Sequence, residues 1–445
     1  MAKDTGKQLR NDVLYSIFVR NYSEEGTFEG VRKDLKRIKD LGVDIIWLMP
    51  IHPTGEKNRK GSLGSPYAIK DYRAINPEFG TLEDFKRLVD DIHALGMKCI
   101  IDVVYNHTSP DSVLSVEHPE WFYHKKNGSF GNRVGDWWDV IDLDYGNKAL
   151  WDYQIETLKY WASIVDGFRC DVASLVPIEF WKRARKEVAQ VRPEALWLAE
   201  SVEMGFITYL RSINIDSSSD SQIFEAFDIS YDYDIFEYEE GYLTGKNSLS
   251  DYLKMVNLQE GIYPDNYDKL RFMENHDRAR AHFLVKDDKS LYNWTAFTYF
   301  QKGTTMLYAG QEKAINHTPT LFDKDPLKWT GNGENGADLD LTPFMQKLYQ
   351  IKKDGLFTDS NYKVCEVADD TVLAVHEERK ICPEYDKPLK KIVGIFSLKG
   401  KENSFHVDGN IIPDGIYENL LDGSDFEVFQ GKAATTGRPV IVKVN

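Results

Sequence analysis

Polar and apolar positions repeat one local order along most of the chain: an amphipathic helix, a glycine, then a short apolar strand. Apolar residues at three- and four-residue spacing between 82 and 95 predict a helix with one apolar face. Thr81 is a good N-cap for it, and Gly96 ends it because glycine tolerates a left-handed backbone. The run KCIIDVVY at 98–105 then predicts a strand covered on both faces.

Eight such apolar runs predict eight strands before residue 311. The runs are residues 13–19, 43–50, 98–105, 168–173, 195–201, 224–231, 269–275 and 304–310. Strands that alternate with helices pair in parallel through right-handed crossovers, and eight units favour a closed barrel. The predicted fold class is therefore α/β, a (β/α)8 TIM barrel.

Two segments break the alternation. Residues 107–146 carry proline, glycine and aromatic residues without a helical stripe, which predicts a small inserted domain after the third strand. Residues 358–445 read as short strands separated by polar turns, which is typical of an antiparallel β-sandwich. The predicted barrel domain thus comprises residues 1–106 and 147–357.

Composition narrows the choice of partners. The net charge of −16 at pH 7 disfavours nucleic acid and anionic membrane surfaces, so a neutral ligand suits the chain better. No run approaches the length of a membrane span, and the N-terminus lacks a signal-peptide pattern, which predicts a cytoplasmic protein. The four cysteines form no C-x-x-C motif. The sequence does not indicate an oligomeric state.

Acidic residues follow several predicted strands, where a barrel of this kind carries its active site. Asp171, Glu200 and Asp277 follow the fourth, fifth and seventh strands, and we expect them to converge on one rim. Each acid alone could instead cap the next helix. Arg169 lies two residues before Asp171 on one strand face, which favours an ionised Asp171.

The surroundings of the acids predict different protonation states. Glu200 follows the apolar run ALWLA, where desolvation favours the protonated carboxyl. One protonated and one ionised acid is the arrangement that glycoside cleavage needs, whereas a carboxylate metal site would need several ionised acids and no arginine. Asp102, in the third strand, is interpreted as a structural partner of Arg169. Tyr67 is the aromatic residue that we expect to contact a sugar ring.

Four segments together resemble the motif regions of the α-amylase family of glycoside hydrolases. They are DVVYNH (102–107), GFRCDVAS (167–174), LAES (198–201) and FMENHD (272–277), and their order, spacing and strand placement match the family. SPYAIKDYRAINPEFGT (65–81) resembles a further family segment. The likeness covers nearly the whole chain, including the barrel, the inserted domain and the C-terminal sandwich.

This resemblance implies site residues and their roles. Catalytic roles fall on Asp171 as nucleophile, Glu200 as acid and base, and Asp277 as stabiliser of the transition state. Substrate-binding roles fall on Tyr67, His107, Arg169 and His276. The resemblance implies a retaining hydrolase of α-1,4-glucosidic bonds in starch-derived glucans and maltooligosaccharides.

Departures from the family pattern affect the metal and the substrate. Secreted α-amylases of the family commonly have Lys-His where this chain has Ser174 and Leu175, and that histidine helps to form the family's usual calcium site and a contact for the leaving sugar. Asn106, a familiar calcium ligand, is present. We assign no required cofactor and no metal ligands, while the resemblance allows for calcium.

Three alternatives to a starch hydrolase remain open. The segment DVAS (171–174) resembles the corresponding segment of neopullulanase and cyclomaltodextrinase relatives. An α-glucan transglycosylase or glucanotransferase would use the same acids. A non-catalytic glucan-binding protein is disfavoured, because all three acids are intact.

Overall fold

The computed structural model describes residues 2, 4–135, 137–330, 339–380, 382 and 388–445. Its strands form a closed barrel in the order β1-β10-β9-β8-β7-β6-β3-β2. The barrel strands are β1 (Val13–Ile17), β2 (Ile45–Leu48), β3 (Lys98–Val103), β6 (Gly167–Cys170), β7 (Leu196–Ala199), β8 (Ile229–Tyr231), β9 (Lys269–Arg271) and β10 (Thr304–Tyr308). Seven of them lie inside their predicted runs and β6 begins one residue before its run, at Gly167, so the (β/α)8 barrel is confirmed.

The helix and strand predicted between residues 81 and 105 are also confirmed. Helix α4 (Leu82–Ala94) begins with a capping box, in which Thr81 and Asp84 satisfy each other's backbone amides. Gly96, with φ of 70°, then turns the chain into β3. Local residue chemistry therefore determines where these two elements begin and end.

Two elements are shorter than the apolar patterns of the sequence that contain them. The sixth run, 224–231, is a strand only over β8, because its first residues continue the helical turn of α9 (Asp220–Ile223). The amide of Phe227 donates to the carbonyl oxygen of Ile223 at 3.0 Å within that turn. The apolar stripe from 28 to 42 is divided into α2 (Phe28–Arg32) and α3 (Leu35–Gly42). Apolar spacing alone does not reveal such interruptions.

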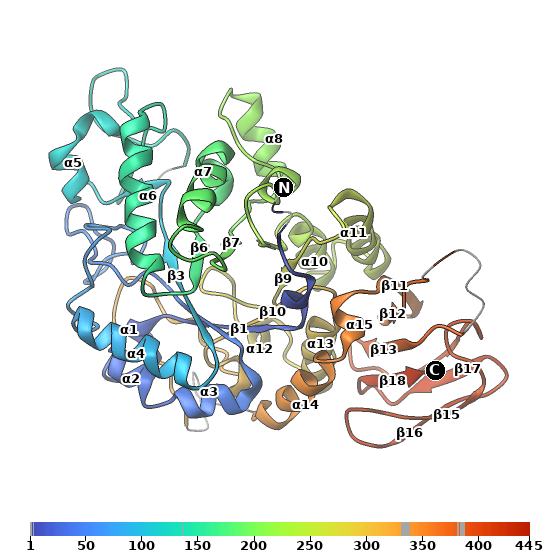
Figure 1. Cartoon of the computed structure of the whole chain (residues 1–445). Helices are drawn as coiled ribbons and strands as arrows, with labels where there is room; N and C mark the ends of the chain where they lie inside the picture. Colours follow the sequence, from blue (N-terminus) through green and yellow to red (C-terminus); the bar gives the residue numbers. More distant parts are fainter. Residues whose placement is uncertain (1, 3, 136, 331–338, 381, 383–387) are drawn as a thin grey trace. The chain divides into compact units, whose positions relative to one another are not determined.

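The chain divides into two compact units, of which the first comprises Met1–Thr5, Leu14–Asp234 and Thr318–Lys328. Strands β1, β2, β3, β6, β7 and β8 pair in parallel in that order. Helices α6 (Lys148–Ala162) and α7 (Ile178–Val188) pack against each other, as Figure 1 shows. Other helices of this unit are α1 (Val19–Tyr22), α5 (Val113–Glu117) and α8 (Met204–Ser212).

The segment between β3 and α6 carries the predicted insertion. Its strands β4 (His107–Thr108) and β5 (Ile141–Asp142) pair antiparallel. Trp121 and Phe122 are buried, whereas Trp138 is 56% exposed. The segment thus buries some of its own aromatic residues, while the predicted boundaries of the three domains stay a prediction.

The second unit comprises Gly6–Val13, Ile235–His317 and Trp329–Asn445. Its C-terminal part forms an antiparallel sheet in the order β11-β12-β13-β18 and two strand pairs, β14-β17 and β15-β16. The strands are β11 (Asn361–Ala368), β12 (Thr371–Glu377), β13 (Lys391–Ser397), β14 (Asn403–His406), β15 (Gly415–Glu418), β16 (Asp425–Val428), β17 (Lys432–Thr435) and β18 (Val440–Val444). The predicted antiparallel C-terminal region is confirmed.

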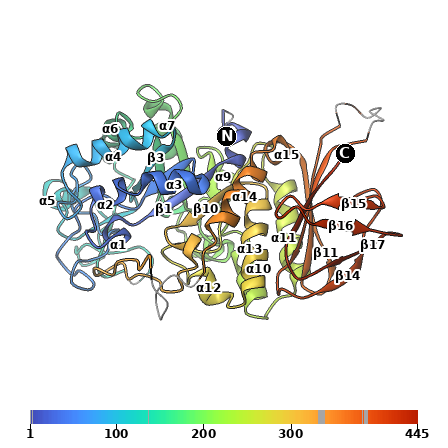
Figure 2. The same cartoon turned by 90° about the horizontal axis from the view of Figure 1, so that it is seen from below.

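Helices of the second unit pack on this sheet. Figure 2 shows α11 (Leu249–Ile262) and α13 (Asp288–Phe300) beside it, and α11 contacts β11 while α13 contacts β13. The amide of Ser397 in β13 donates to the side chain of Asn293 in α13 at 2.8 Å. The helices are α10 (Phe236–Leu243), α11 (Leu249–Ile262), α12 (Ala281–Leu284), α13 (Asp288–Phe300), α14 (Thr342–Lys352) and α15 (Gly355–Thr358).

Among the described residues, every helix is too short or too polar to cross a membrane.

Candidate functional site

A buried arginine at the end of β6 lies at the centre of the candidate site. Arg169 is fully buried, and its Nη1 donates to Asp171 Oδ1 at 2.9 Å and to Asp102 Oδ1 at 3.0 Å. Its Nη2 forms an ion pair of 3.0 Å with Glu200 Oε2. One guanidinium therefore holds three carboxylates from three neighbouring strands, β3, β6 and β7, which pair in parallel.

Parallel register explains this convergence. Asp102 pairs with Arg169, and Arg169 pairs with Leu198, so the residues after each strand emerge at the same level. Burial by itself would lower the pKa of Arg169. The negative charges of Asp102 and Glu200 outweigh this effect, so the pKa lies well above its ordinary value. The guanidinium stays charged, as a buried partner of several carboxylates must.

Aromatic rings enclose the guanidinium. Its carbon lies 5.0 Å from the ring centre of Trp47, 5.4 Å from that of Tyr231 and 5.7 Å from that of Tyr67. The hydroxyl of Tyr67 also donates to Asp102 Oδ2 at 3.2 Å. Such contacts stabilise a cation away from water. Tyr67 therefore contacts Arg169 and Asp102, as a member of the candidate site would, and the interpretation of Asp102 as a partner of Arg169 is confirmed.

His107 reaches the other oxygen of Asp171. Its Nε2 lies 3.9 Å from Asp171 Oδ2, and its Nδ1 accepts from Asn106 Nδ2 at 3.1 Å. Desolvation lowers the pKa of His107. A neutral ring whose Nδ1 accepts carries its proton on Nε2, so this N–H faces Asp171.

Glu200 is held by the backbone that follows Asp171. The amide of Val172 donates to Glu200 Oε2 at 2.7 Å, and the amide of Ala173 donates to the Glu200 carbonyl oxygen at 2.9 Å. The ion pair with Arg169 and this amide contact were not foreseen from the apolar run before Glu200. Both depend on the pairing of β6 with β7, which no local pattern reveals.

The remaining two predicted residues lie in the second unit, just after β9. His276 Nε2 lies 3.1 Å from Asp277 Oδ2, and the side chain of Asp277 is 48% exposed. The side chain of Asn275 accepts hydrogen bonds of 2.9 Å from the amides of Asp277 and Arg278. These contacts stabilise the turn that presents His276 and Asp277.

Sequence analysis missed Tyr231, Trp47 and Val172. Tyr231 is the last residue of β8, and its position at a strand end was an available signal. Trp47 lies inside β2, where a buried aromatic residue is the ordinary case. The contact of Val172 is made by its backbone, so no residue type signals it.

The residues around Asn106 do not fit a calcium ion. Asp142 accepts from the amide of Arg133 at 2.7 Å, and Asp144 forms a 3.2 Å ion pair with the Arg133 guanidinium. Asp139 forms an ion pair of 2.8 Å with Lys60. Among the described residues, no group of three His, Cys, Asp or Glu side chains could hold a metal. The protein's own cations thus pair with Asp139 and Asp144, and a backbone amide binds Asp142.

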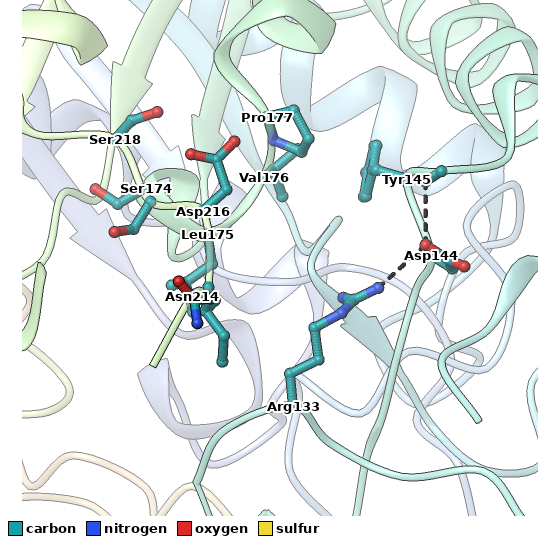
Figure 3. A pocket seen from close by; sticks show the side chains of 13 residues that line it. Arg133, Asp144, Tyr145, Ser174, Leu175, Val176, Pro177, Asn214, Asp216 and Ser218 are labelled. Carbon is teal, nitrogen blue, oxygen red and sulfur yellow. Dashed lines mark hydrogen bonds and ion pairs between the residues drawn. The ribbon is translucent and has the colours of Figure 1, made fainter. Parts of the chain in front are cut away.

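A cavity of about 300 Å³ lies beside the turn that follows Asp171 and Val172 (Figure 3). Its walls come from three segments of the first unit: Ser174–Pro177, Asn214–Ser218 and Asp144–Gly146, together with Arg133. The hydroxyls of Ser174 and Ser217 are buried there without a hydrogen-bond partner in the described structure. Buried hydroxyls of this kind favour a polar occupant.

Comparison with known proteins identifies the family. The alpha-amylase catalytic domain matches residues 11–138 and 112–338, and the bacterial alpha-amylase C-terminal domain matches residues 369–442. The chain belongs to the alpha-amylase family. It is an enzyme of that family, a glycoside hydrolase or transferase, and the family implies an α-glucan substrate.

Individual relatives agree with this assignment. A crystal structure of an alpha-amylase from Lactobacillus plantarum is 47% identical, with a TM-score of 0.92 over 99% of this chain and 100% of that chain. A maltogenic alpha-amylase from Thermotoga neapolitana is 32% identical, with a TM-score of 0.83 over 98% of this chain and 99% of that one.

A transferase is also similar, over a shorter region. The alpha-1,4-glucan:maltose-1-phosphate maltosyltransferase of Salinibacter ruber is 33% identical over 224 residues, which are 44% of this chain and 34% of that protein.

Proposed function

We propose that the protein is a retaining glycoside hydrolase that cleaves α-1,4-glucosidic bonds in starch-derived glucans and maltooligosaccharides. The observation that carries this proposal is the shared guanidinium, which contacts Asp171 at 2.9 Å and Glu200 at 3.0 Å. Two carboxylates that are bound by adjacent nitrogens of one planar guanidinium are expected to lie close to each other. This favours the carboxyl separation of retaining enzymes, about 5–5.5 Å, over the wider separation of inverting enzymes.

The two carboxylates divide the proposed reaction. Asp171 Oδ1 is held by Arg169, so Oδ2 attacks the anomeric carbon while Glu200 gives its proton to the leaving oxygen. The bond from the anomeric carbon to the leaving oxygen breaks, and an ester to Asp171 forms. Water then gives a proton to Glu200 and attacks the same carbon, which releases Asp171 and regenerates both acids.

Substrate contacts are proposed for the other site residues. Tyr67 would lie against the apolar face of a sugar ring, and the Nε2–H of His107 would donate to a sugar hydroxyl near Asp171. By their place in the fourth motif, His276 and Asp277 would bind hydroxyls of the distorted sugar and stabilise positive charge in the transition state. The expectations of a cytoplasmic location and of no nucleic-acid or membrane partner stay predictions.

Proton NMR of maltoheptaose with the protein tests the proposal through the anomeric signals. Early appearance of the α-anomer, equilibrating later, is the expected result for cleavage with retention. An initial β-anomer would exclude the covalent intermediate. Asp171→Asn and Glu200→Gln are each expected to lower kcat by at least about 10³-fold, whereas Glu179→Gln, on the exposed side of α7, should leave it unchanged.

Transfer to a second sugar or to phosphate is the alternative that this relative favours, since the maltosyltransferase of Salinibacter ruber is 33% identical over 224 residues. The cavity beside Ser174, next to the turn that follows Asp171, has room for an acceptor. Adding maltose or inorganic phosphate to the same NMR experiment separates the outcomes. Longer chains or a glycosyl phosphate would indicate a transferase, and cyclodextrin cleavage would indicate the cyclomaltodextrinase type.

A further inference from the structure

The residue after the proposed nucleophile has an unusual backbone. Val172 has φ of 34° and ψ of 47°, in the left-handed region. Five other non-glycine residues of the described structure have positive φ: Asn58, Asn214, Ala314, Asp370 and Gln430. Val172 is the one β-branched residue in this described set, and β-branched residues rarely adopt this conformation. Its surroundings must therefore hold it there.

The left-handed turn brings two successive amides to one residue. The N–H of Val172 donates to the Glu200 carboxylate oxygen Oε2 at 2.7 Å, and the N–H of Ala173 donates to the Glu200 backbone oxygen at 2.9 Å. The Glu200 amide in turn donates to the carbonyl oxygen of Cys170 at 3.0 Å. Side chain and backbone of Glu200 are thus both bound to the segment that carries Asp171.

We propose that Val172 is a positioning residue, whose left-handed backbone directs its N–H onto Glu200 Oε2 and so orients the acid relative to Asp171. This proposal rests on the proposed function, because it assigns to Glu200 the proton transfer described above. Oε2 already accepts from Val172 and pairs with Arg169, so Oε1 is the oxygen that carries the proton to the leaving group.

The same contact tunes the acid as well as orienting it. A hydrogen bond from a backbone amide to a carboxylate favours the ionised form. Charged and titratable groups that face Glu200 within its unit include Arg169 on β6 and Tyr231 on β8, with Asp102 and Asp171 across the same guanidinium. Removing the N–H of Val172 while keeping these groups therefore isolates its effect.

An amide-to-ester change at residue 172 makes this removal. Replacing Val172 by its α-hydroxy acid analogue deletes the N–H but keeps the side chain. The pH at which kcat falls on the basic side is expected to rise by about half to one unit, since Glu200 must be protonated to act. kcat at the optimum is expected to fall at least about tenfold. If this basic limb of the pH profile of kcat were unchanged, the proposal would be overturned.

Two matched variants separate positioning from loss of structure. The same ester at Ala173 removes an N–H that binds the backbone of Glu200, so it is expected to lower stability without moving the basic limb. Val172→Gly keeps the N–H and accepts a left-handed backbone, so its basic limb is expected to match the unsubstituted protein. A shift in either variant as large as that of the ester at 172 would contradict the role of this amide.

A readout independent of activity distinguishes this proposal from the proposed function. Carbon-13 labelling of glutamate carboxyls, with Glu200→Gln to assign the signal, follows the titration of Glu200 directly. An upward shift of its pKa in the 172 ester, in a protein that does not cleave glucans, would support the contact and reject the hydrolase. Activity on maltoheptaose with no shift of this titration would reject the contact alone.

Discussion

At the scale of single residues, the shared guanidinium makes this site unusually dependent on one side chain. Arg169 is the common partner of Asp102, Asp171 and Glu200. Arginine presents several donors in one rigid plane, whereas lysine offers a point charge on a flexible stem. Loss of one partner also leaves the remaining buried charges uncompensated.

Arg169→Lys is therefore expected to lower kcat by at least about 10²-fold, because a single ammonium cannot hold both proposed catalytic carboxylates. Arg169→Met is expected to lower the free energy of unfolding by about 3–5 kcal/mol. Steady-state kinetics and urea unfolding check the two outcomes. Arg183→Lys, at an exposed ion pair with Asp152, is the control that should change neither, and full activity of Arg169→Lys would contradict the shared-guanidinium account.

At the scale of elements, the spacing of β6 and β7 determines whether the two acids face each other. Gly167, the first residue of β6, pairs with Leu196 of β7. A Cβ at Gly167 would lie 2.2 Å from the carbonyl oxygen of Leu196, far inside van der Waals contact. Since backbone cannot rotate away as a side chain can, the strands themselves would have to separate.

Gly167→Ala is expected to lower the free energy of unfolding by about 1–3 kcal/mol and to reduce kcat, because it displaces Arg169 and Asp171 from Glu200. Gly205→Ala is the matched control: apart from chain neighbours and the backbone of α8 itself, no described atom lies within 4 Å of a Cβ added there, and alanine favours a helix by about 0.5–1 kcal/mol. Urea unfolding of both variants checks the contrast. Equal effects at the two positions would refute the close approach of β6 and β7.

The inserted segment is the second element with a testable consequence. Arg133 and Lys60 neutralise Asp144 and Asp139, and the amide of Arg133 binds Asp142. Because chain cations and a backbone amide already satisfy these carboxylates, a chelator is expected to leave the melting temperature and kcat unchanged. Differential scanning fluorimetry and activity with EDTA or with added calcium check this. If EDTA removed the activity and added calcium restored it, these carboxylates would be shown to bind the ion.

At the scale of the whole molecule, buried histidines in both units link stability to pH. Burial lowers the pKa of His52 to about 4 and that of His376 to about 3. Both rings make hydrogen bonds inside the fold, His52 to the carbonyl oxygen of Ala74 and His376 to that of Phe300. The folded protein therefore keeps these two rings neutral at a pH where the unfolded chain protonates them.

The stabilisation from each histidine is fully present above the unfolded pKa of about 6.5 and is lost as pH falls toward the folded value. For His52 the loss by pH 4 is about 3 kcal/mol. The urea midpoint measured between pH 7.5 and 4 is expected to fall, and to fall less steeply in His52→Gln. His406→Gln, at an exposed position, should keep the original slope, and an equal slope in all three proteins would contradict the prediction.

Much of the molecule followed from sequence because the governing interactions are local. The capping box at Thr81, the glycine stop at Gly96 and the apolar runs of the eight strands depend on neighbouring residues, and the barrel followed from their alternation. Arg169 and Asp171, two residues apart, could be recognised as partners because they share a strand face. The motif order then indicated the family.

Tertiary structure alone decided the contacts that depend on strand pairing. The ion pair of Glu200 with Arg169 and the hydrogen bond from Val172 exist because β6 lies beside β7 in one register, and the ring of Tyr231 reaches the guanidinium from β8. The arginine-based neutralisation of Asp144 likewise needs the fold of the inserted segment. Residue types indicate which groups can react. The distances between these groups arise from packing between segments that are far apart in sequence.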